Sequence, residues 1–199
     1  FGSGAATTTS VAAVSGVATF TNLKLTGTVG SYTITYRLAA DTTITGTQSI
    51  SLSFGAANKL ALTTSAAGFV NRVAFTTQPA VTIQDADGNT VTDSTALVSV
   101  ASSAGNGATL STTLSVNAVS GVATFSGLKF TGAVGDYTLT FSQGALTTVT
   151  QTITLLPGSA TKLAVTRSSA GITNRVAFTT QPKVTVQDAD GNTVTTSTA

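Results

Sequence analysis

Several residue types that most enzymes need are missing from this sequence of 199 residues. It contains no Cys, His, Met, Trp or Glu, so its seven acidic residues are all Asp. Most general acid–base pairs, covalent nucleophiles and transition-metal sites are built from His, Cys and Glu. The composition therefore predicts that the chain is not an enzyme and uses no cofactor. Without Cys it also forms no disulfide bond.

Charge is scarce as well. Charged residues make up 8% of the chain, whereas hydrophobic residues reach 41%. The net charge of +2 comes from nine scattered Lys and Arg residues that form no basic patch, so nucleic-acid binding is not expected. No apolar run approaches the roughly 20 residues that a membrane-spanning helix needs, so we expect no membrane span in this segment.

The chain repeats itself. Residues 59–96 return as residues 162–199, and only eight of these 38 positions differ. Residues 14–36 return in the same way as residues 119–141. The two offsets of 103 and 105 residues predict a tandem array of domain-sized repeats, each long enough to bury a core of its own. We expect residues 1–57 to be the later part of one repeat, residues 58–160 a complete repeat, and residues 161–199 the opening part of a third.

Each repeat has the pattern of short β-strands. Thr and other β-branched residues favour a pleated surface, and no segment shows the 3.6-residue period of an amphipathic helix. The clearest strand is 136–141, where Tyr137, Leu139 and Phe141 alternate with polar residues. Turn sequences include Asp87-Gly88, Ser120-Gly121 and a flexible Gly-rich loop at 102–108. Seven or eight strands per repeat predict an all-β fold, an antiparallel two-sheet sandwich.

The order of these motifs resembles a known family. A strand, a QDADGNTV turn, a Gly-rich loop, SGVATF and VGDYTLTF follow one another as in the bacterial immunoglobulin-like (Big) domains. Such domains occur in tandem in invasin-like and intimin-like adhesins and in other giant bacterial surface proteins. Tyr32 and Tyr137 resemble the corner tyrosine of an immunoglobulin sandwich. The resemblance implies an immunoglobulin-like (Ig-like) sandwich in an extracellular rod at the bacterial surface, without carrying over a receptor-binding site.

One turn that occurs twice carries most of the acidic residues. Its side-chain oxygens stand at alternate positions beside a Gly, which is a pattern that calcium loops use. The spacing departs from that of an EF-hand, because the Gly is fourth and position twelve is Ala96. An ordinary Asx turn is therefore the favoured interpretation, and no metal site is expected. The weak calcium candidates are Asp85, Asp87, Asn89, Asp188, Asp190 and Asn192.

Other repeated side chains allow further interpretations. Lys59 and Lys162 occupy matching places and could form isopeptide bonds, although ordinary surface lysines are favoured. Arg72 and Arg175 are each expected to pair with a nearby Asp. Thr-x-Thr patterns such as 138–140 could bind ice or carry O-linked sugars, but an outward strand face is the simpler interpretation.

These observations predict a structural protein. Near-identical repeats can all contribute to length and stiffness in the same way, so we expect an extracellular stalk or filament. The alternative is a repetitive adhesin that binds a glycan or another surface ligand by avidity.

The partners expected are neighbouring repeats or other copies of the chain. Residues 1–57 and 161–199 supply complementary parts of one repeat. We therefore expect exposed apolar side chains at both ends, and strand pairing or lateral packing between units.

Overall fold

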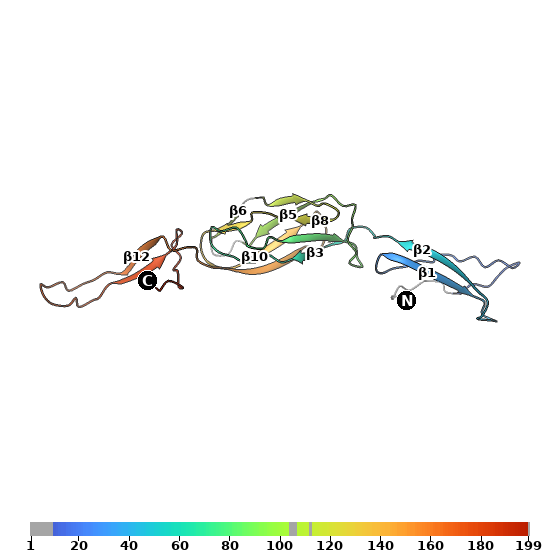
Figure 1. Cartoon of the computed structure of the whole chain (residues 1–199), viewed down its shortest axis with the longest axis horizontal. Helices are drawn as coiled ribbons and strands as arrows, with labels where there is room; N and C mark the ends of the chain where they lie inside the picture. Colours follow the sequence, from blue (N-terminus) through green and yellow to red (C-terminus); the bar gives the residue numbers. More distant parts are fainter. Residues whose placement is uncertain (1–9, 104–106, 112, 199) are drawn as a thin grey trace.

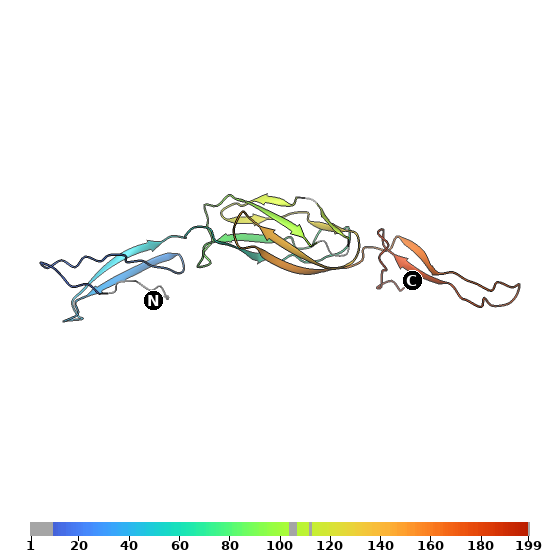
Figure 2. The same ribbon diagram turned by 180° about the vertical axis from the view of Figure 1, so that it is seen from behind.

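The computed structural model describes residues 10–103, 107–111 and 113–198. The chain forms three units in a row, with a complete β-sandwich in the middle and an open β-hairpin on either side (Figures 1 and 2). None of the described residues forms a helix long and apolar enough to cross a membrane. The expected loop at 102–108 is described only in part, since residues 104–106 lie outside the described residues.

The regular elements in the described part of the middle unit are all β-strands. Its strands are β3 (Lys59–Thr64), β4 (Ala80–Gln84), β5 (Leu97–Ser102), β6 (Thr109–Ser111), β7 (Ser115–Asn117), β8 (Val122–Thr124), β9 (Lys129–Thr131), β10 (Gly135–Ser142) and β11 (Val149–Leu155). These nine described strands exceed the seven or eight expected, because the pairing is divided among four strands of only three residues.

The strands form antiparallel sheets, which confirms the predicted fold class. One sheet has the order β11-β10-β5-β7, a second has the order β3-β4-β8, and β6 pairs with β9 in a short ribbon. The pairing between β10 and β11 runs from Gly135 opposite Leu155 to Phe141 opposite Val149. Long antiparallel strands with alternate side chains buried need a second layer to cover them, and here the β3-β4-β8 sheet supplies that layer.

The core confirms the period-two prediction for β10. Tyr137, Leu139 and Phe141 are at most 1% exposed, and Thr138 and Thr140 between them are half-buried. Aromatic rings meet across the core, with Phe130 and Tyr137 centroids 4.9 Å apart. The other buried hydrophobic residues are Leu60, Ala66, Phe75, Val81, Ile83, Val91, Val98, Val100, Ala118, Ala123, Phe125, Leu128, Ile153 and Leu155.

Tyr137 also forms the corner contact that the sequence suggested. Its hydroxyl donates to the Ala133 carbonyl four residues upstream, at 2.8 Å, and accepts from the Ala108 amide at 3.0 Å. Tyr32 donates to the Thr28 carbonyl in the same way, at 2.6 Å. A tyrosine hydroxyl bonded to backbone just upstream is a feature of immunoglobulin-type sandwiches.

The two flanking units reproduce parts of the middle one. The first unit contains β1 (Gly30–Arg37) and β2 (Thr45–Leu52), which pair from Gly30 opposite Leu52, in the register of β10 and β11. The third unit contains β12 (Lys162–Arg167) and β13 (Lys183–Gln187), which pair as β3 and β4 do, including the same irregularity near the end of the ladder.

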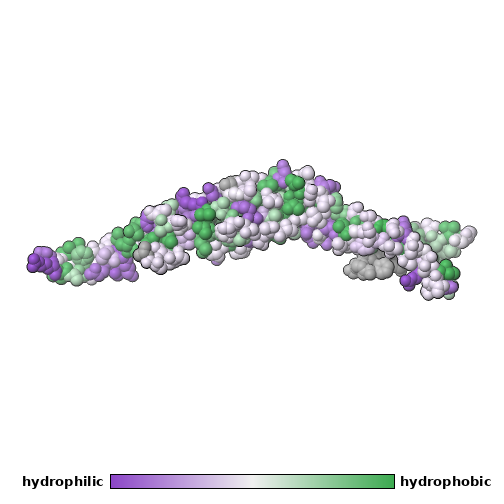
Figure 3. Space-filling model, viewed as in Figure 1, coloured by the Kyte–Doolittle hydropathy of each residue, from purple (hydrophilic) through white to green (hydrophobic). Residues whose placement is uncertain are grey.

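Apolar side chains that are buried in the middle unit are exposed in the flanking units. Leu60 is 5% exposed and its counterpart Leu163 is 69% exposed, while Leu128 is fully buried and its counterpart Leu23 is 40% exposed. Figure 3 shows separate hydrophobic patches on the flanking units as well as on the middle unit. The other exposed large hydrophobic residues of the flanking units are Val14, Val17, Val29, Leu38, Ile44, Val165, Ile172, Val176 and Val184.

Candidate functional site

The turn that follows β4 is held in shape by its own side chains. The Asp85 Oδ1 atom accepts from the Asn89 amide at 2.8 Å, and the Asp85 amide donates to the Asn89 carbonyl at 2.9 Å. Gly88 has a φ of 90°, a conformation that glycine adopts at little cost. Gln84 and Thr90 then form an antiparallel bridge, so the chain reverses direction as expected from the sequence.

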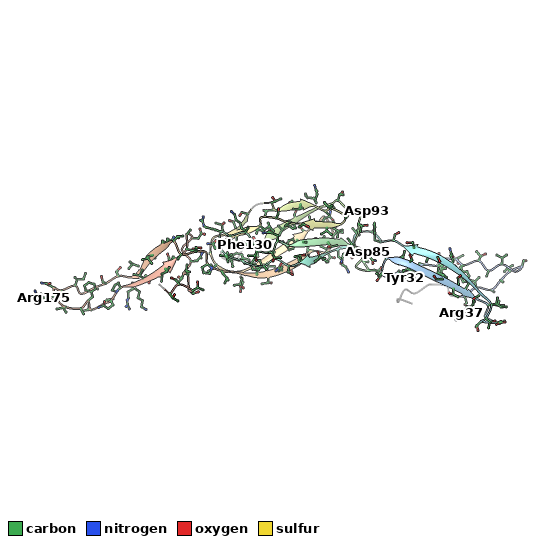
Figure 4. All side chains as sticks on the ribbon, viewed as in Figure 1. Tyr32, Arg37, Asp85, Asp93, Phe130 and Arg175 are labelled. Atoms are coloured by element: carbon green, nitrogen blue, oxygen red, sulfur yellow. The ribbon has the colours of Figure 1, made fainter. Side chains whose placement is uncertain are left out.

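This turn binds the preceding unit. The Gly55 amide donates to Asp85 Oδ2 at 2.9 Å, and the Val29 amide donates to Asn89 Oδ1 at 2.9 Å. The Asn89 Nδ2 atom donates to the Gly27 carbonyl and to Asp85 Oδ2, each at 2.9 Å. Side chains of the middle unit therefore satisfy backbone groups in the loops of the first unit. Figure 4 shows Asp85 at the end of the middle unit that faces the first unit.

The second copy of the turn makes the same contacts at the next junction. The Gly158 amide donates to Asp188 Oδ2 at 2.9 Å, and the Val134 amide donates to Asn192 Oδ1 at 3.0 Å. The Asn192 Nδ2 atom donates to the Gly132 carbonyl and to Asp188 Oδ2, each at 2.9 Å. Because four hydrogen bonds recur at matched positions, the two junctions share one geometry.

The second junction contains an additional pair of side chains, Asn71 and Arg72. The Asn71 Nδ2 atom donates to Asp188 Oδ2 at 2.8 Å and to Asp190 Oδ2 at 2.7 Å. The Arg72 guanidinium donates to both carboxylate oxygens of Asp190, at 2.7 and 2.6 Å. Two parallel charge-assisted bonds fix distance and orientation together.

Hydrogen bonding keeps the junction carboxylates ionised. The Gly55 amide, with help from the Asn89 side chain, lowers the pKa of Asp85 to about 2. The Arg72 guanidinium, with help from Asn71, lowers the pKa of Asp190 to about 2, and Asp190 in turn raises the pKa of Arg72. Amides that donate to a carboxylate stabilise its charged form.

Asp188 is the most buried of these carboxylates, at 1% exposed. Its burial favours the neutral acid and raises its pKa, but hydrogen bonds from Asn192, Asn71 and Gly158 outweigh that effect, so the net pKa lies well below its usual range. The charged form is therefore the one that holds the junction together.

Acid should loosen the junctions. Since the folded pKa values of Asp85, Asp188 and Asp190 are lowered, the stability they contribute is complete above the ordinary pKa of roughly 4 and is lost as pH falls through the lowered values, toward 2. Small-angle scattering between pH 7 and pH 2 should show a constant rod down to about pH 4 and bending between the units below it. Bending that is already complete at pH 6 would contradict this assignment.

The structure divides the six calcium candidates between the two junctions. Three of them lie at the first junction and three at the second. Backbone amides donate to the side-chain oxygens of Asp85, Asn89, Asp188 and Asn192, while Asn71 and Arg72 donate to Asp190. Within the described ranges no three acidic, His or Cys side chains form a group that could hold a metal ion. The expectation of an ordinary Asx turn without a metal stays a prediction, with calcium binding as its weaker alternative.

The predicted Arg–Asp pairing exists for Arg72, but its partner Asp190 lies in the next unit. Sequence reasoning missed Asn71 altogether. The available signal was the repeated Asn-Arg dipeptide at 71–72 and 174–175, which lies between strands and contributes little to a core. The two matched lysines make local contacts, since Lys59 donates to the Ala86 carbonyl and Lys162 to the Ala189 carbonyl.

The fold and the junctions define an all-β protein whose neighbouring units are joined by a repeated polar contact. No protein-family model matches the chain, and no curated protein matches its sequence. Solved structures with partial similarity include a β-glycosidase from Bacteroides vulgatus, with 16% identity, a TM-score of 0.41, and coverage of 55% of this chain and 15% of that one.

Two further similar structures are β-glucuronidases. That of Parabacteroides merdae has 10% identity and a TM-score of 0.38, covering 62% of this chain and 16% of that one. β-Glucuronidase 3 of Bacteroides uniformis has 13% identity and a TM-score of 0.38, covering 66% of this chain and 17% of that one. This chain thus spans about one sixth of the length of these proteins, and the likeness carries no conclusion about activity.

Proposed function

We propose that this protein is a non-enzymatic, extracellular structural stalk or filament of tandem Ig-like repeats, related to the bacterial immunoglobulin-like domains that its motifs resemble. The observation that carries the proposal is the duplicated junction. Three hydrogen bonds join Asp85 and Asn89 to the first unit, and the same three join Asp188 and Asn192 to the middle unit. A linkage that recurs at both junctions serves length and direction, which are the properties of a stalk.

The connections between units support stiffness. Only six residues separate the end of β2 at Leu52 from the start of β3 at Lys59, and six separate Leu155 from Lys162. Gly55 and Gly158, within these segments, each donate to a buried Asp of the following unit. Short segments that are tied down in this way do not act as flexible linkers.

A repetitive adhesin is the second candidate, favoured by one observation. Thr150, Thr152 and Thr154 are exposed on the outward face of β11, so their hydroxyl groups form a row. Hydroxyl rows can bind sugars, and many weak sites in an array would act by avidity. Glycan-array binding by this chain would favour the adhesin over the plain stalk.

Scattering can test the stalk. Small-angle X-ray scattering of the monomeric chain at neutral pH should fit a rod in which a complete repeat adds roughly 35 to 45 Å, from strands of about 3.3 Å per residue plus loops. A variant with a flexible Gly-Ser insertion after Ala160 is the control, and its scattering should indicate a bent, multi-conformer chain. If the unmodified chain scatters like that variant, the stalk proposal is wrong.

A further inference from the structure

Two segments of the complete middle unit run side by side in the same direction. Every ladder between the named strands is antiparallel, whereas two isolated bridges are parallel and connect Lys59 with Thr147 and Val70 with Leu156. These bridges join residues 58–71, through which the chain enters the unit, to residues 147–156, through which it leaves. We call this contact the parallel seam.

Backbone hydrogen bonds close the end of the parallel seam that lies next to the first unit. The Leu60 amide donates to the Thr147 carbonyl at 2.9 Å, and the Thr147 amide donates to the Asn58 carbonyl at 3.2 Å. Leu60 is 5% exposed, so water has little access to the place of these bonds. The entering segment is thus held to the leaving segment from its first residues on.

A glutamine side chain bridges the middle of the parallel seam. The Gln151 Oε1 atom accepts from the Ala66 amide at 2.9 Å, and the Gln151 Nε2 atom donates to the Ala66 carbonyl at 2.8 Å. The side-chain amide therefore pairs with backbone as a neighbouring strand would. Ala66 is 4% exposed, so its two backbone groups would lose their hydrogen bonds without gaining water if Gln151 moved away.

The other end of the parallel seam coincides with the second junction. The Leu156 amide donates to the Phe69 carbonyl and the Asn71 amide donates to the Leu156 carbonyl, each at 2.9 Å. The Asn71 side chain also donates to Asp188 of the third unit at 2.8 Å. One residue therefore ends the seam and ties the entering segment to the next unit.

The neighbouring units lie so that tension would load the parallel seam lengthwise. The first and third units are at opposite ends of the middle unit (Figures 1 and 2). Tension between them draws Asn58 toward the first unit and Leu156 toward the third. Because the two segments are parallel, one must slide along the other, and the six hydrogen bonds of the seam are strained together.

The antiparallel ladders of the unit respond differently to the same tension. In the hairpin of β10 and β11, Gly135 and Leu155 lie opposite each other, so separating these two ends would open the ladder one pair at a time. β3 also pairs with β4, but β4 pairs next with β8, and force that enters this ladder must cross further strands to reach β11. The parallel seam is the direct connection between the entering and the leaving segment.

We propose that the parallel seam is the element with which the repeat resists tension along the stalk, and that Gln151 is its central residue. The added function is mechanical, since the seam passes force from one neighbouring unit to the next while the sandwich stays folded. This role rests on the proposed stalk, because a stalk is anchored at one end and pulled at the other. The resistance of the seam can be measured without reference to that function.

The first test compares two pulling directions on the full 199-residue chain. Because the chain contains no Cys, handles for single-molecule force measurement attach only where Cys is introduced. Ala57→Cys with Ser159→Cys loads the seam lengthwise, and Ala57→Cys with Thr148→Cys pulls apart its end at the first unit; all three sites are exposed. At the same force the middle unit should unfold roughly tenfold or more slowly in the lengthwise direction, because its hydrogen bonds must break together. Equal unfolding rates in the two directions would overturn the proposal.

The second test removes the bridge in the middle of the seam. Gln151→Leu leaves both backbone groups of Ala66 without partners, so unfolding under lengthwise force should become roughly tenfold faster or more. Gln78→Leu is the matched control, because Gln78 bonds in the same way to the Leu128 amide and carbonyl, at 3.0 and 3.2 Å, outside the seam. Both variants should lose stability in denaturant, whereas Gln78→Leu should keep the wild-type unfolding rate under lengthwise force.

The possible outcomes separate the seam from the stalk. Equal acceleration of the two glutamine variants under lengthwise force would show that Gln151 acts only through overall stability, and would overturn its assignment. If Gln151→Leu does not fold, the comparison of pulling directions on the otherwise unmodified chain decides alone. A bent chain in the scattering experiment would overturn the stalk and would leave the measured resistance of the seam unchanged.

Discussion

Replacing Leu128 by Ala should destabilise the middle unit by about 3 kcal/mol, whereas Leu23→Ala should cost less than about 1 kcal/mol. The two leucines occupy the same place in successive repeats. Leu128 is fully buried and Leu23 is 40% exposed. Truncating a buried leucine loses the transfer free energy of its side chain and creates a cavity. Truncating an exposed leucine loses much less transfer free energy and creates no cavity.

Denaturation followed by circular dichroism measures both variants. For a unit of this size the Leu128 variant should melt roughly 10 to 20 °C lower than the wild type. The experiment should be done at low protein concentration, so that association between copies does not cover Leu23. Equal losses for the two variants would mean that the first unit has a closed core of its own.

Replacing Asp188 by Ala should uncouple the middle and third units. The carboxylate accepts from Asn71, Gly158 and Asn192, and it is 1% exposed. Its removal leaves buried donors without an acceptor, at a cost of about 1 to 3 kcal/mol for each unsatisfied group. We expect the junction to open at least tenfold more often, while the middle unit keeps its own stability.

Distances between spin labels can show this. Because the chain contains no Cys, a label can be attached at Ser126→Cys in the middle unit and another at Ser168→Cys in the third. The Asp188→Ala variant should have a broad distance distribution and the parent a narrow one. Asp136→Ala is the matched control, because Asp136 accepts from Thr154 within one hairpin. A narrow distance distribution for both variants would show that the hydrogen bonds of Asp188 are not the source of the stiffness.

Much of the fold could be predicted from the sequence. Alternation in β10 placed Tyr137, Leu139 and Phe141 inside because side chains in a strand point to opposite faces. The Asp-Gly turn after β4 and the Ser120-Gly121 turn were predictable from local backbone chemistry, and Gly88, Ser120 and Gly121 do adopt positive φ. The division of the pairing into nine described strands was not predictable, because a three-residue strand is too short to show a periodic pattern.

The candidate site was predictable only in its location. Repetition singled out the turn residues Asp85 and Asp188, but a local pattern does not state whether oxygens face a cation or amide groups. The answer depended on Gly55, Gly158 and Asn71, which lie 30 or more positions away from the turns they bind.

The sequence by itself determined an all-β chain with repeated turns, since strand alternation, turn chemistry and composition are local properties. Only the tertiary structure decided that the turn joins neighbouring units and that Arg72 pairs with Asp190 at a separation of 118 residues. It also decided that Leu163 is exposed while Leu60 is buried, although the two have nearly the same sequence around them. Burial and pairing depend on which strands arrive from elsewhere in the chain to cover a surface, and a local sequence carries no record of them.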